Sequence, residues 1–189
     1  IGLLLNMLDK HIGSDEVNAA LKIAPHVFLR PGELTGLLWS EVDFHARLIR
    51  INADRMKTKK VHLVPMSTQV LATLKNLRQI DTGSDYVFPT PRNRNASITT
   101  NALLVAIRSL GIDKFTFITH GFRSMASTRL NELGYRTDVV ELQLALTQSN
   151  TLRAVYNRNE HLEERRTMMQ EWSDHLAKLK DITPSLSLD

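Results

Sequence analysis

His120 and Arg123 are the residues whose types and spacing first indicate chemistry. They lie three positions apart, at the start of a segment whose pattern predicts a helix over 120–133. Side chains at i and i+3 share one face of a helix, and a helix N-terminus carries free N–H groups and partial positive charge. An imidazole, a guanidinium and a helix N-terminus that point one way would suit a phosphate. A capped surface turn is the alternative interpretation of the same pair.

A second arginine, Arg30, precedes Pro31 and lies one turn before Glu33. Pro31 suits the first turn of a helix and biases the residue before it away from helical backbone. Arg30 would then lie at the lip of a buried helix, where Glu33 could hold its guanidinium for a bidentate contact with phosphate. The alternative is a surface arginine that is only paired with Glu33.

Two further features could take part in phosphate chemistry. The stretch between two expected strands is basic, and one of its lysines could reach into a groove or toward a leaving group; an exposed basic loop is the alternative. Its cations are Arg55, Lys57, Lys59 and Lys60. Tyr156 lies one helical turn after Leu152, a spacing that by itself is typical of a core tyrosine.

The composition and the missing motifs exclude some kinds of functional site. The chain has no cysteine and lacks the HExxH and GxxxxGK[ST] motifs, so we expect neither a metal nor a cofactor. Its net charge of +4 is a modest lean toward polyanions. No apolar run approaches the roughly 18 residues that a membrane helix needs. Phosphate chemistry would then need two arginines, a general acid, a general base and a side-chain nucleophile, and the chain offers Arg30, Arg123, Lys57, His120 and Tyr156.

The elements that must position these residues are mostly helices. Apolar residues at helical spacing predict helices over 15–24, from 31 up to Trp39, and over 67–77, 100–110, 120–133, 139–146 and 160–180, with another that begins near Leu152. Pro25, Gly111 and Gly134 are expected to end three of them. Residues 48–51 and 61–64 predict two strands of a hairpin.

These elements predict a mainly α fold with a small antiparallel β-sheet (α+β). Residues 91–97 form a polar loop that contains Arg92 and Arg94 and is the best candidate for a mobile segment. We expect one domain over residues 1–180, taken from a longer protein, and a tail over 181–189 that is flexible or docks elsewhere.

The chain resembles the catalytic domain of the tyrosine recombinases, the phage integrase family, and within it the integrases of prophages and genomic islands. The matching motifs follow the order of that family over about residues 16–178. They are Leu29-Arg30-Pro31-Gly32-Glu33-Leu34 with Trp39-Ser40-Glu41-Val42-Asp43, Arg55-Met56-Lys57 with His62-Leu63-Val64-Pro65, Thr119-His120-Gly121-Phe122-Arg123 with Ala126-Ser127-Thr128, Glu141-Leu142-Gln143-Leu144-Ala145, Arg153-Ala154-Val155-Tyr156-Asn157-Arg158, and Glu163-Glu164-Arg165-Arg166 with Met168-Met169-Gln170 and Trp172.

The resemblance implies a DNA breaking-rejoining fold and a role for each candidate residue. Tyr156 would attack the scissile phosphate and form a 3′-phosphotyrosyl link. Arg30 and Arg123 would hold the non-bridging oxygens, Lys57 would be the general acid, and His120 would assist proton transfer. Glu33 would orient Arg30. Lys59 and Lys60 lie near enough to Lys57 to replace it.

Partners follow from the same resemblance. Double-stranded DNA that carries an attachment site would be bound by Arg55, Lys59, Lys60, Arg92, Arg94, Arg153 and Arg158. We expect a tetramer on DNA, a monomer that binds DNA weakly when this chain is isolated, and a place in the bacterial cytoplasm at the nucleoid. An excision factor and a host DNA-bending protein are candidates for further partners.

One position departs from the family pattern. The motif runs Leu144-Ala145-Leu146-Thr147, where the family usually has a histidine or tryptophan at position 146. Leucine cannot donate a hydrogen bond, and losing one such donor costs roughly 2.7–4 kcal/mol of transition-state stabilisation. We therefore expect a weakened enzyme, with an inactive DNA-binding module as the alternative.

Two other functions are less favoured. A type IB topoisomerase is disfavoured by the stretch from Met168 to Trp172. A helical protein-interaction domain would leave the ordered series of arginine, lysine, histidine and tyrosine motifs as a coincidence.

Overall fold

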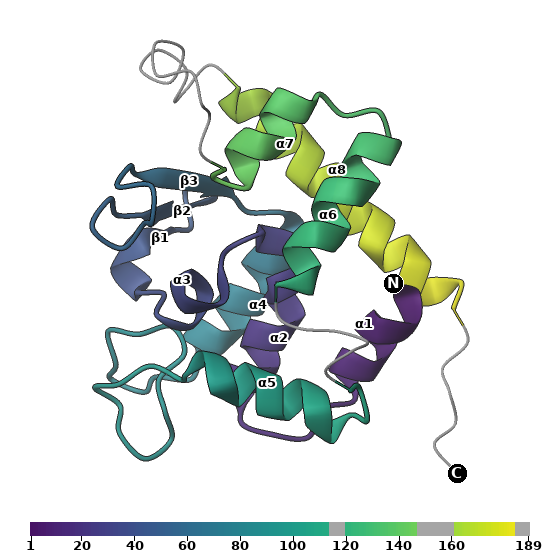
Figure 1. Cartoon of the computed structure of the whole chain (residues 1–189). Helices are drawn as coiled ribbons and strands as arrows, with labels where there is room; N and C mark the ends of the chain where they lie inside the picture. The colour runs from purple at the N-terminus through teal and green to yellow at the C-terminus, as the bar shows by residue number, and fades with distance from the viewer. Residues whose placement is uncertain (114–119, 147–160, 184–189) are drawn as a thin grey trace.

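The computed structural model describes residues 1–113, 120–146 and 161–183 of the chain. Helices dominate these residues, and a three-stranded antiparallel sheet lies at one side of them (Figure 1). The helices are α1 (Gly2–Asp9), α2 (Asp15–Val27), α3 (Pro31–Thr35), α4 (Thr68–Arg78), α5 (Thr100–Ser109), α6 (Gly121–Glu132), α7 (Thr137–Gln143) and α8 (Leu162–Asp181). The predicted fold class, mainly α with a small antiparallel sheet, is confirmed.

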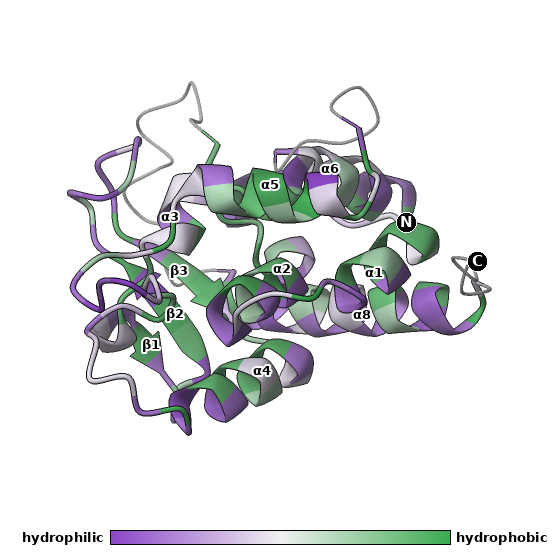
Figure 2. Ribbon diagram, turned by 90° about the horizontal axis from the view of Figure 1, so that it is seen from below, coloured by the Kyte–Doolittle hydropathy of each residue, from purple (hydrophilic) through white to green (hydrophobic). Residues whose placement is uncertain are grey.

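Helix α2 is the centre of the fold. It contacts α1, α3, α4, α5, α6 and α8, and Leu21, Ile23 and Val27 on it are almost completely buried. Apolar residues of the surrounding helices also belong to this core, and hydrophobic stretches alternate with hydrophilic ones along these helices (Figure 2). Trp172 of α8 is fully buried, and its indole Nε1–H donates to the Pro25 carbonyl at 2.9 Å. This contact fixes the long C-terminal helix against the central one.

The sheet is built from β1 (Val42–Asp43), β2 (Leu48–Ile51) and β3 (His62–Pro65), in the order β1-β2-β3. The expected hairpin is confirmed, with Ile49 opposite Val64 and Ile51 opposite His62. Strand β3 begins one residue later than predicted, and β1 was not predicted because two residues are too short to show an alternating pattern. The β2–β3 connection carries the basic stretch that includes Lys57.

Side-chain caps start three helices where the sequence indicates. Ser14 accepts from the Val17 N–H, Ser67 from the Val70 N–H and Thr99 from the Ala102 N–H. Each hydroxyl satisfies an N–H group that has no partner within its helix. Helices α2, α4 and α5 therefore begin at or next to the predicted positions. Helices α6 and α8 have no side-chain cap, yet they also begin and end within two residues of the prediction.

Two predicted helix ends were wrong. Pro25 does not end α2, which continues to Val27, because Val27 is fully buried there and the Pro25 carbonyl has the Trp172 donor. Helix α3 stops at Thr35 and does not extend to Trp39. Leu37 and Leu38 instead pair with residues 86–87: the Val87 N–H donates to the Leu37 carbonyl at 2.8 Å, and Leu38 forms an isolated bridge with Tyr86.

Two other elements differ from the sequence prediction. Helix α1 was not expected as a helix, although it contributes Leu5 and Leu8 to the core. Helix α7 starts two residues earlier and ends three residues earlier than the predicted 139–146 segment, because Ala145 takes a left-handed φ of 48°. None of the described helices is long and apolar enough to cross a lipid bilayer.

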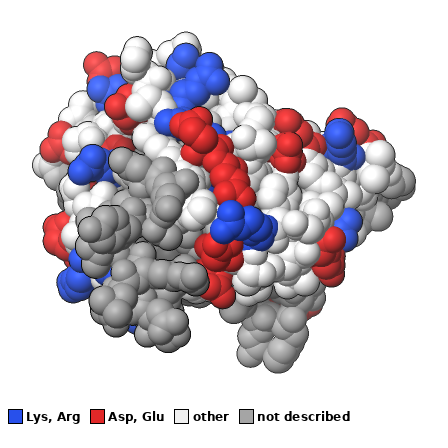
Figure 3. All heavy atoms as spheres, turned by 90° about the horizontal axis from the view of Figure 1, so that it is seen from above, with Lys and Arg blue, Asp and Glu red and all other residues white. Residues whose placement is uncertain are grey.

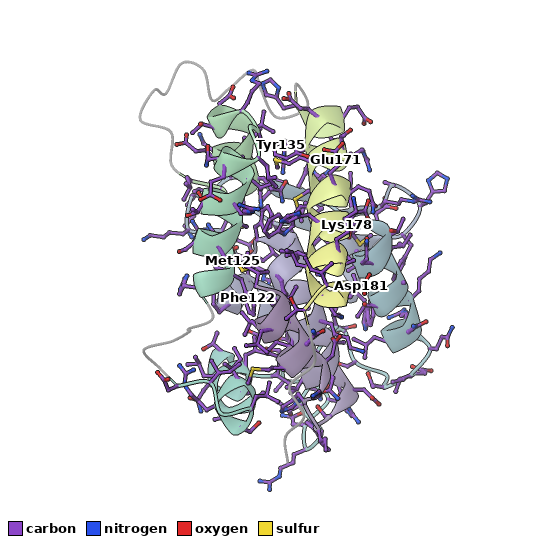
Figure 4. All side chains as sticks on the ribbon, turned by 90° about the vertical axis from the view of Figure 1, so that its right-hand side faces the viewer. Phe122, Met125, Tyr135, Glu171, Lys178 and Asp181 are labelled. Atoms are coloured by element: carbon purple, nitrogen blue, oxygen red, sulfur yellow. The ribbon has the colours of Figure 1, made fainter. Side chains whose placement is uncertain are left out.

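Helix α6 lies beside α8, and the turn after α6 is joined to α8 by one polar contact (Figure 4). The Tyr135 hydroxyl donates to the Glu171 carboxylate. Burial and this carboxylate raise the pKa of Tyr135 above its ordinary value. Tyr135 is therefore held on the α8 side of α6 as a protonated hydrogen-bond donor.

Candidate active site

Arg30 is positioned by the start of α3. Pro31 occupies the first helical position, and Arg30 has the extended backbone that a following proline favours, with φ −65° and ψ 150°. The Glu33 carboxylate accepts from the Arg30 main-chain N–H at 2.9 Å and from its Nη1 at 2.8 Å. Glu33 is buried, at 6% exposure. One buried carboxylate thus fixes both the main chain and the guanidinium of Arg30.

Arg123 lies in the first turn of α6 and is buried at 9% exposure. Its guanidinium donates from Nη1 to the Phe28 carbonyl and from Nη2 to the Leu144 carbonyl, the second at 2.5 Å. Burial and the nearby Arg30 cation lower the pKa of Arg123 to about 10, while Glu33 opposes the shift. The side chain therefore stays protonated at neutral pH and carries its charge deep in the protein.

The two arginines meet at the end of α7. Arg30 Nη2 donates to the Ala145 carbonyl at 3.2 Å, directly after the Leu144 carbonyl that Arg123 holds. Phe28 and Ala145, which supply two of the three carbonyls, have left-handed φ values of 57° and 48°. Side-chain-bearing residues rarely take this conformation, and such residues cluster at binding and active sites.

A cavity of about 460 Å³ opens beside Arg30. Of the predicted catalytic residues, Arg30, Lys57 and His120 line it, together with Glu33, Arg55 and Thr100. Arg123 does not line this cavity, but it is linked to Arg30 because the two guanidinium groups bind the adjacent Leu144 and Ala145 carbonyls. The arrangement places two guanidinium groups, an ammonium and an imidazole within one region, which suits a negatively charged tetrahedral group such as a phosphodiester.

The basic β2–β3 connection is anchored at its start. Arg55 forms an ion pair with the buried Glu41 and donates from Nη2 to the Glu33 carbonyl at 3.1 Å. The next residue, Met56, also anchors the connection, because its side chain is buried at 1% exposure. A Cβ on Gly36 would lie 3.0 Å from Arg55 Nη2, so glycine at position 36 leaves room for this guanidinium. Arg55 therefore braces α3 and the connection, and only Lys57 follows it into the cavity.

The remaining predicted cations among the described residues are all exposed, but their partners differ. Lys59 and Lys60 are exposed, and Lys59 Nζ lies 3.4 Å from the Asp54 carbonyl. Arg92 is exposed, whereas Arg94 pairs with the buried Glu16 at 2.6 Å. Burial alone would raise the pKa of Glu16, but a main-chain hydrogen bond and Arg94 lower it overall. The 91–97 loop is closed by the Thr90 N–H, which donates to the Ala96 carbonyl at 2.8 Å.

Leu146 follows the carbonyls that the arginines hold. Its side chain is 46% exposed, and its N–H donates to the Glu141 carbonyl at 3.1 Å.

Three of the predicted site residues, Tyr156, Arg153 and Arg158, lie outside the described residues. Among the residues that are described, no three His, Asp or Glu side chains converge in a way that could hold a metal ion.

Behind the arginines lies a polar cluster that the sequence interpretation missed. Arg165 donates from Nε to Gln143 Oε1 at 2.9 Å and from Nη2 to the Leu63 carbonyl. The buried imidazole of His62 belongs to the same cluster: burial and the Arg165 cation lower its pKa, and the main chain of Gln143 opposes the shift. The helical period could have revealed Arg165, because positions 165, 168, 169, 172 and 176 share the buried face of α8.

Comparison with known proteins gives one consistent result. A model described as the phage integrase family matches residues 3–163. Prophage integrase IntA of Escherichia coli (strain K12) is 39% identical over 152 residues, which cover 80% of this chain and 36% of that protein. The integrase of Shigella phage Sf6 is 39% identical over 158 residues, which cover 83% of this chain and 41% of that protein. The chain thus spans about two fifths of the length of these relatives.

Solved structures share the fold. The integrase from mycobacterium phage Brujita superposes with a TM-score of 0.68 at 17% identity, over 99% of this chain and 59% of that chain. XerA recombinase gives a TM-score of 0.60 at 21% identity, over 87% of this chain and 60% of that chain. A structure of the Tn1549 transposon integrase in complex with circular intermediate DNA gives 0.59 at 17% identity, over 80% of this chain and 56% of that chain.

Proposed function

Because this chain belongs to the phage integrase family, we propose that residues 1–180 are the catalytic domain of a tyrosine recombinase that integrates and excises a prophage or genomic island. The observation that carries the proposal is the meeting of Arg30 and Arg123 at the Leu144–Ala145 carbonyls, beside a cavity that Lys57 and His120 also line. Residues 181–189 would be a tail that is flexible or docks on a neighbouring subunit.

The reaction is a transesterification. The Tyr156 hydroxyl oxygen attacks phosphorus and loses its proton, with His120 assisting that transfer; the bond from phosphorus to the 5′-oxygen breaks, and Lys57 protonates the departing 5′-oxygen. Arg30 and Arg123 neutralise the charge on the non-bridging oxygens in the transition state. One phosphodiester replaces another, so the attack of a 5′-hydroxyl on the phosphotyrosine can rejoin the strand without a further energy source.

Double-stranded DNA with an attachment site is the proposed substrate. Lys59, Lys60 and Arg92 are exposed and would contact phosphates, with Arg94, Arg153 and Arg158 as further candidates. Arg55 would contribute by bracing the connection that carries Lys57. The full-length protein would act as a tetramer on DNA at the bacterial nucleoid in the cytoplasm, with an excision factor and a host DNA-bending protein as proposed helpers. Binding through phosphate contacts should weaken steeply as salt rises.

Cleavage of a nicked suicide substrate tests the proposal. The full-length protein is incubated with duplex that carries the attachment site of its element, and a covalent adduct is sought on a denaturing gel. We expect an adduct from the parent and none from Tyr156→Phe, because phenylalanine lacks the attacking oxygen. Leu146→His should raise the rate by up to about a hundredfold, the value of one oxyanion donor. If Tyr156→Phe still forms the adduct, Tyr156 is not the nucleophile.

Substitution of Lys57 distinguishes it from the neighbouring lysines. Lys57→Met should slow cleavage about a hundredfold, within the usual contribution of a general acid, whereas Lys59→Met and Lys60→Met should change it less than threefold. A substrate with sulfur in place of the bridging 5′-oxygen should restore the Lys57→Met rate, because a thiolate leaves without protonation. A Lys57→Met defect of equal size on the sulfur substrate would argue against the general-acid role.

A further inference from the structure

We infer that Arg165 is a positioning residue that sets the geometry of the Arg30–Arg123 pair through the end of α7. The inference rests on the proposed function and extends it to a buried contact between α8, α7 and β3. Arg165 acts through Gln143, the last residue of α7, and so through the two carbonyls that follow it.

The burial of Arg165 is the first observation. The residue is 3% exposed, and the ion pairs among the described residues do not include it. Its partners there are uncharged, namely Gln143 Oε1 at 2.9 Å and the Leu63 carbonyl. A buried cation without a carboxylate costs folding free energy that an apolar side chain of similar size would not. Stability alone therefore does not account for an arginine at this position.

The second observation is the sequence of contacts that leads from Arg165 to the phosphate-binding pair. Gln143 is fully buried, and its side-chain oxygen accepts from Arg165 Nε at 2.9 Å. The next two residues supply the Leu144 carbonyl to Arg123 and the Ala145 carbonyl to Arg30. Because both guanidinium groups take their acceptors from this segment, a shift of Gln143 moves both of them. A displacement of about 1 Å at a reacting centre can cost a hundredfold in rate.

Arg166 provides the matched control. It lies on the same helix, but its side chain is 29% exposed and pairs with Glu163 at 3.1 Å. On the face of the molecule that is seen from above, Lys and Arg side chains are interspersed with Asp and Glu side chains over the described part (Figure 3). Replacing Arg166 removes one exposed ion pair of small value. It leaves every contact of the α7 end in place.

Cleavage of two substrates distinguishes a positioning role of Arg165 from a role in the stability of the fold alone. One is the ordinary nicked duplex, and the other carries a methyl group in place of a non-bridging oxygen, so its scissile phosphate is uncharged. On the charged substrate, Arg165→Lys and Gln143→Leu should slow single-turnover cleavage by about tenfold to a hundredfold. The upper value is the loss of rate that a displacement of about 1 Å can cause. On the uncharged substrate the defect should shrink to less than threefold, because the charge that the arginines neutralise is gone. Equal defects on both substrates would overturn the inference.

A binding measurement tests the role of Arg165 independently of cleavage. If the parent forms no adduct, the proposed function fails, but the binding measurement can still decide the inference. The chain of residues 1–189 is labelled with ¹⁵N and titrated with inorganic phosphate while the Nε–H signals of Arg30 and Arg123 are followed. We expect both signals to respond in the parent and in Arg166→Gln, and the apparent dissociation constant to rise at least fivefold in Gln143→Leu and Arg165→Lys. An unchanged constant in these variants, or no response in the parent, would contradict the inference.

Discussion

Replacing Arg123 by lysine should lower the rate of adduct formation about a thousandfold. Lysine keeps the charge, but it cannot span the Phe28 and Leu144 carbonyls that the guanidinium holds together. One of those buried acceptors would lose its partner, and the remaining ammonium would present a single point charge to the phosphate. The loss of an aligned donor at an oxyanion site accounts for roughly 10²–10³ in rate, and the disturbed carbonyls also affect Arg30.

Single-turnover cleavage and urea unfolding, measured on the same variants, check this prediction. Arg129→Lys is the matched control, because Arg129 lies on the same helix and pairs with the exposed Glu132 at 2.8 Å. We expect Arg123→Lys to lose about 1–3 kcal/mol of unfolding free energy, the usual penalty for an unsatisfied buried group. Cleavage by Arg123→Lys at more than a tenth of the parent rate would show that a bidentate guanidinium is not required.

The chain should lose about 4 kcal/mol of stability when the pH falls from 7 to 5. Burial, reinforced by the cations of Arg165, Arg123 and Arg30, lowers the pKa of His62 to about 3. Burial and Lys180 lower the pKa of His26 to about 4, although Asp9 opposes the shift. The ordinary histidine value is 6.5. Below that pH the unfolded chain takes up protons that the folded chain excludes, so stability is full above pH 6.5 and falls as the pH drops.

The size of this effect follows from the pH interval. Between pH 6.5 and 5 each excluded proton costs about 2 kcal/mol, because one pH unit corresponds to about 1.36 kcal/mol. Domains are typically stable by about 5–15 kcal/mol, so two such histidines would remove a large share. Urea unfolding at pH 7, 6 and 5 measures the change. His62→Gln and His26→Gln should each halve the pH dependence, and a parent curve that is flat over this range would contradict the assignment.

Local sequence signals predicted the elements well where the causes are local. Ser14, Ser67 and Thr99 cap helices because the hydroxyl of each accepts a hydrogen bond from the N–H three residues later. The left-handed turn at Ala145 and the end of α3 were missed because they depend on distant partners. Leu37 bonds to Val87, and Ala145 accepts from Arg30, 115 positions away. No periodicity within a short window contains that information.

The candidate site divides in the same way. The resemblance of short motifs predicts roles for Arg30, Glu33, Lys57, His120 and Arg123. Four of these residues line one cavity, and Arg123 is linked to Arg30 through adjacent carbonyls. Sequence alone could not show that Arg55 pairs with Glu41 and that Lys57, but neither Lys59 nor Lys60, lines the cavity. Nor could it show the contact of Arg165 with Leu63, which joins residues 102 positions apart. These features depend on which surfaces the folded chain brings together.

The three carbonyls of Phe28, Leu144 and Ala145 would have a consequence for the entropy of the phosphate binding that we propose. A free arginine side chain samples many rotamers, and ordering it costs about 2 kcal/mol. Here the carbonyls and Glu33 already hold both guanidinium groups in place before any phosphate arrives. The conformational freedom of both side chains is therefore lost during folding, and an incoming phosphodiester meets donors that need little rearrangement.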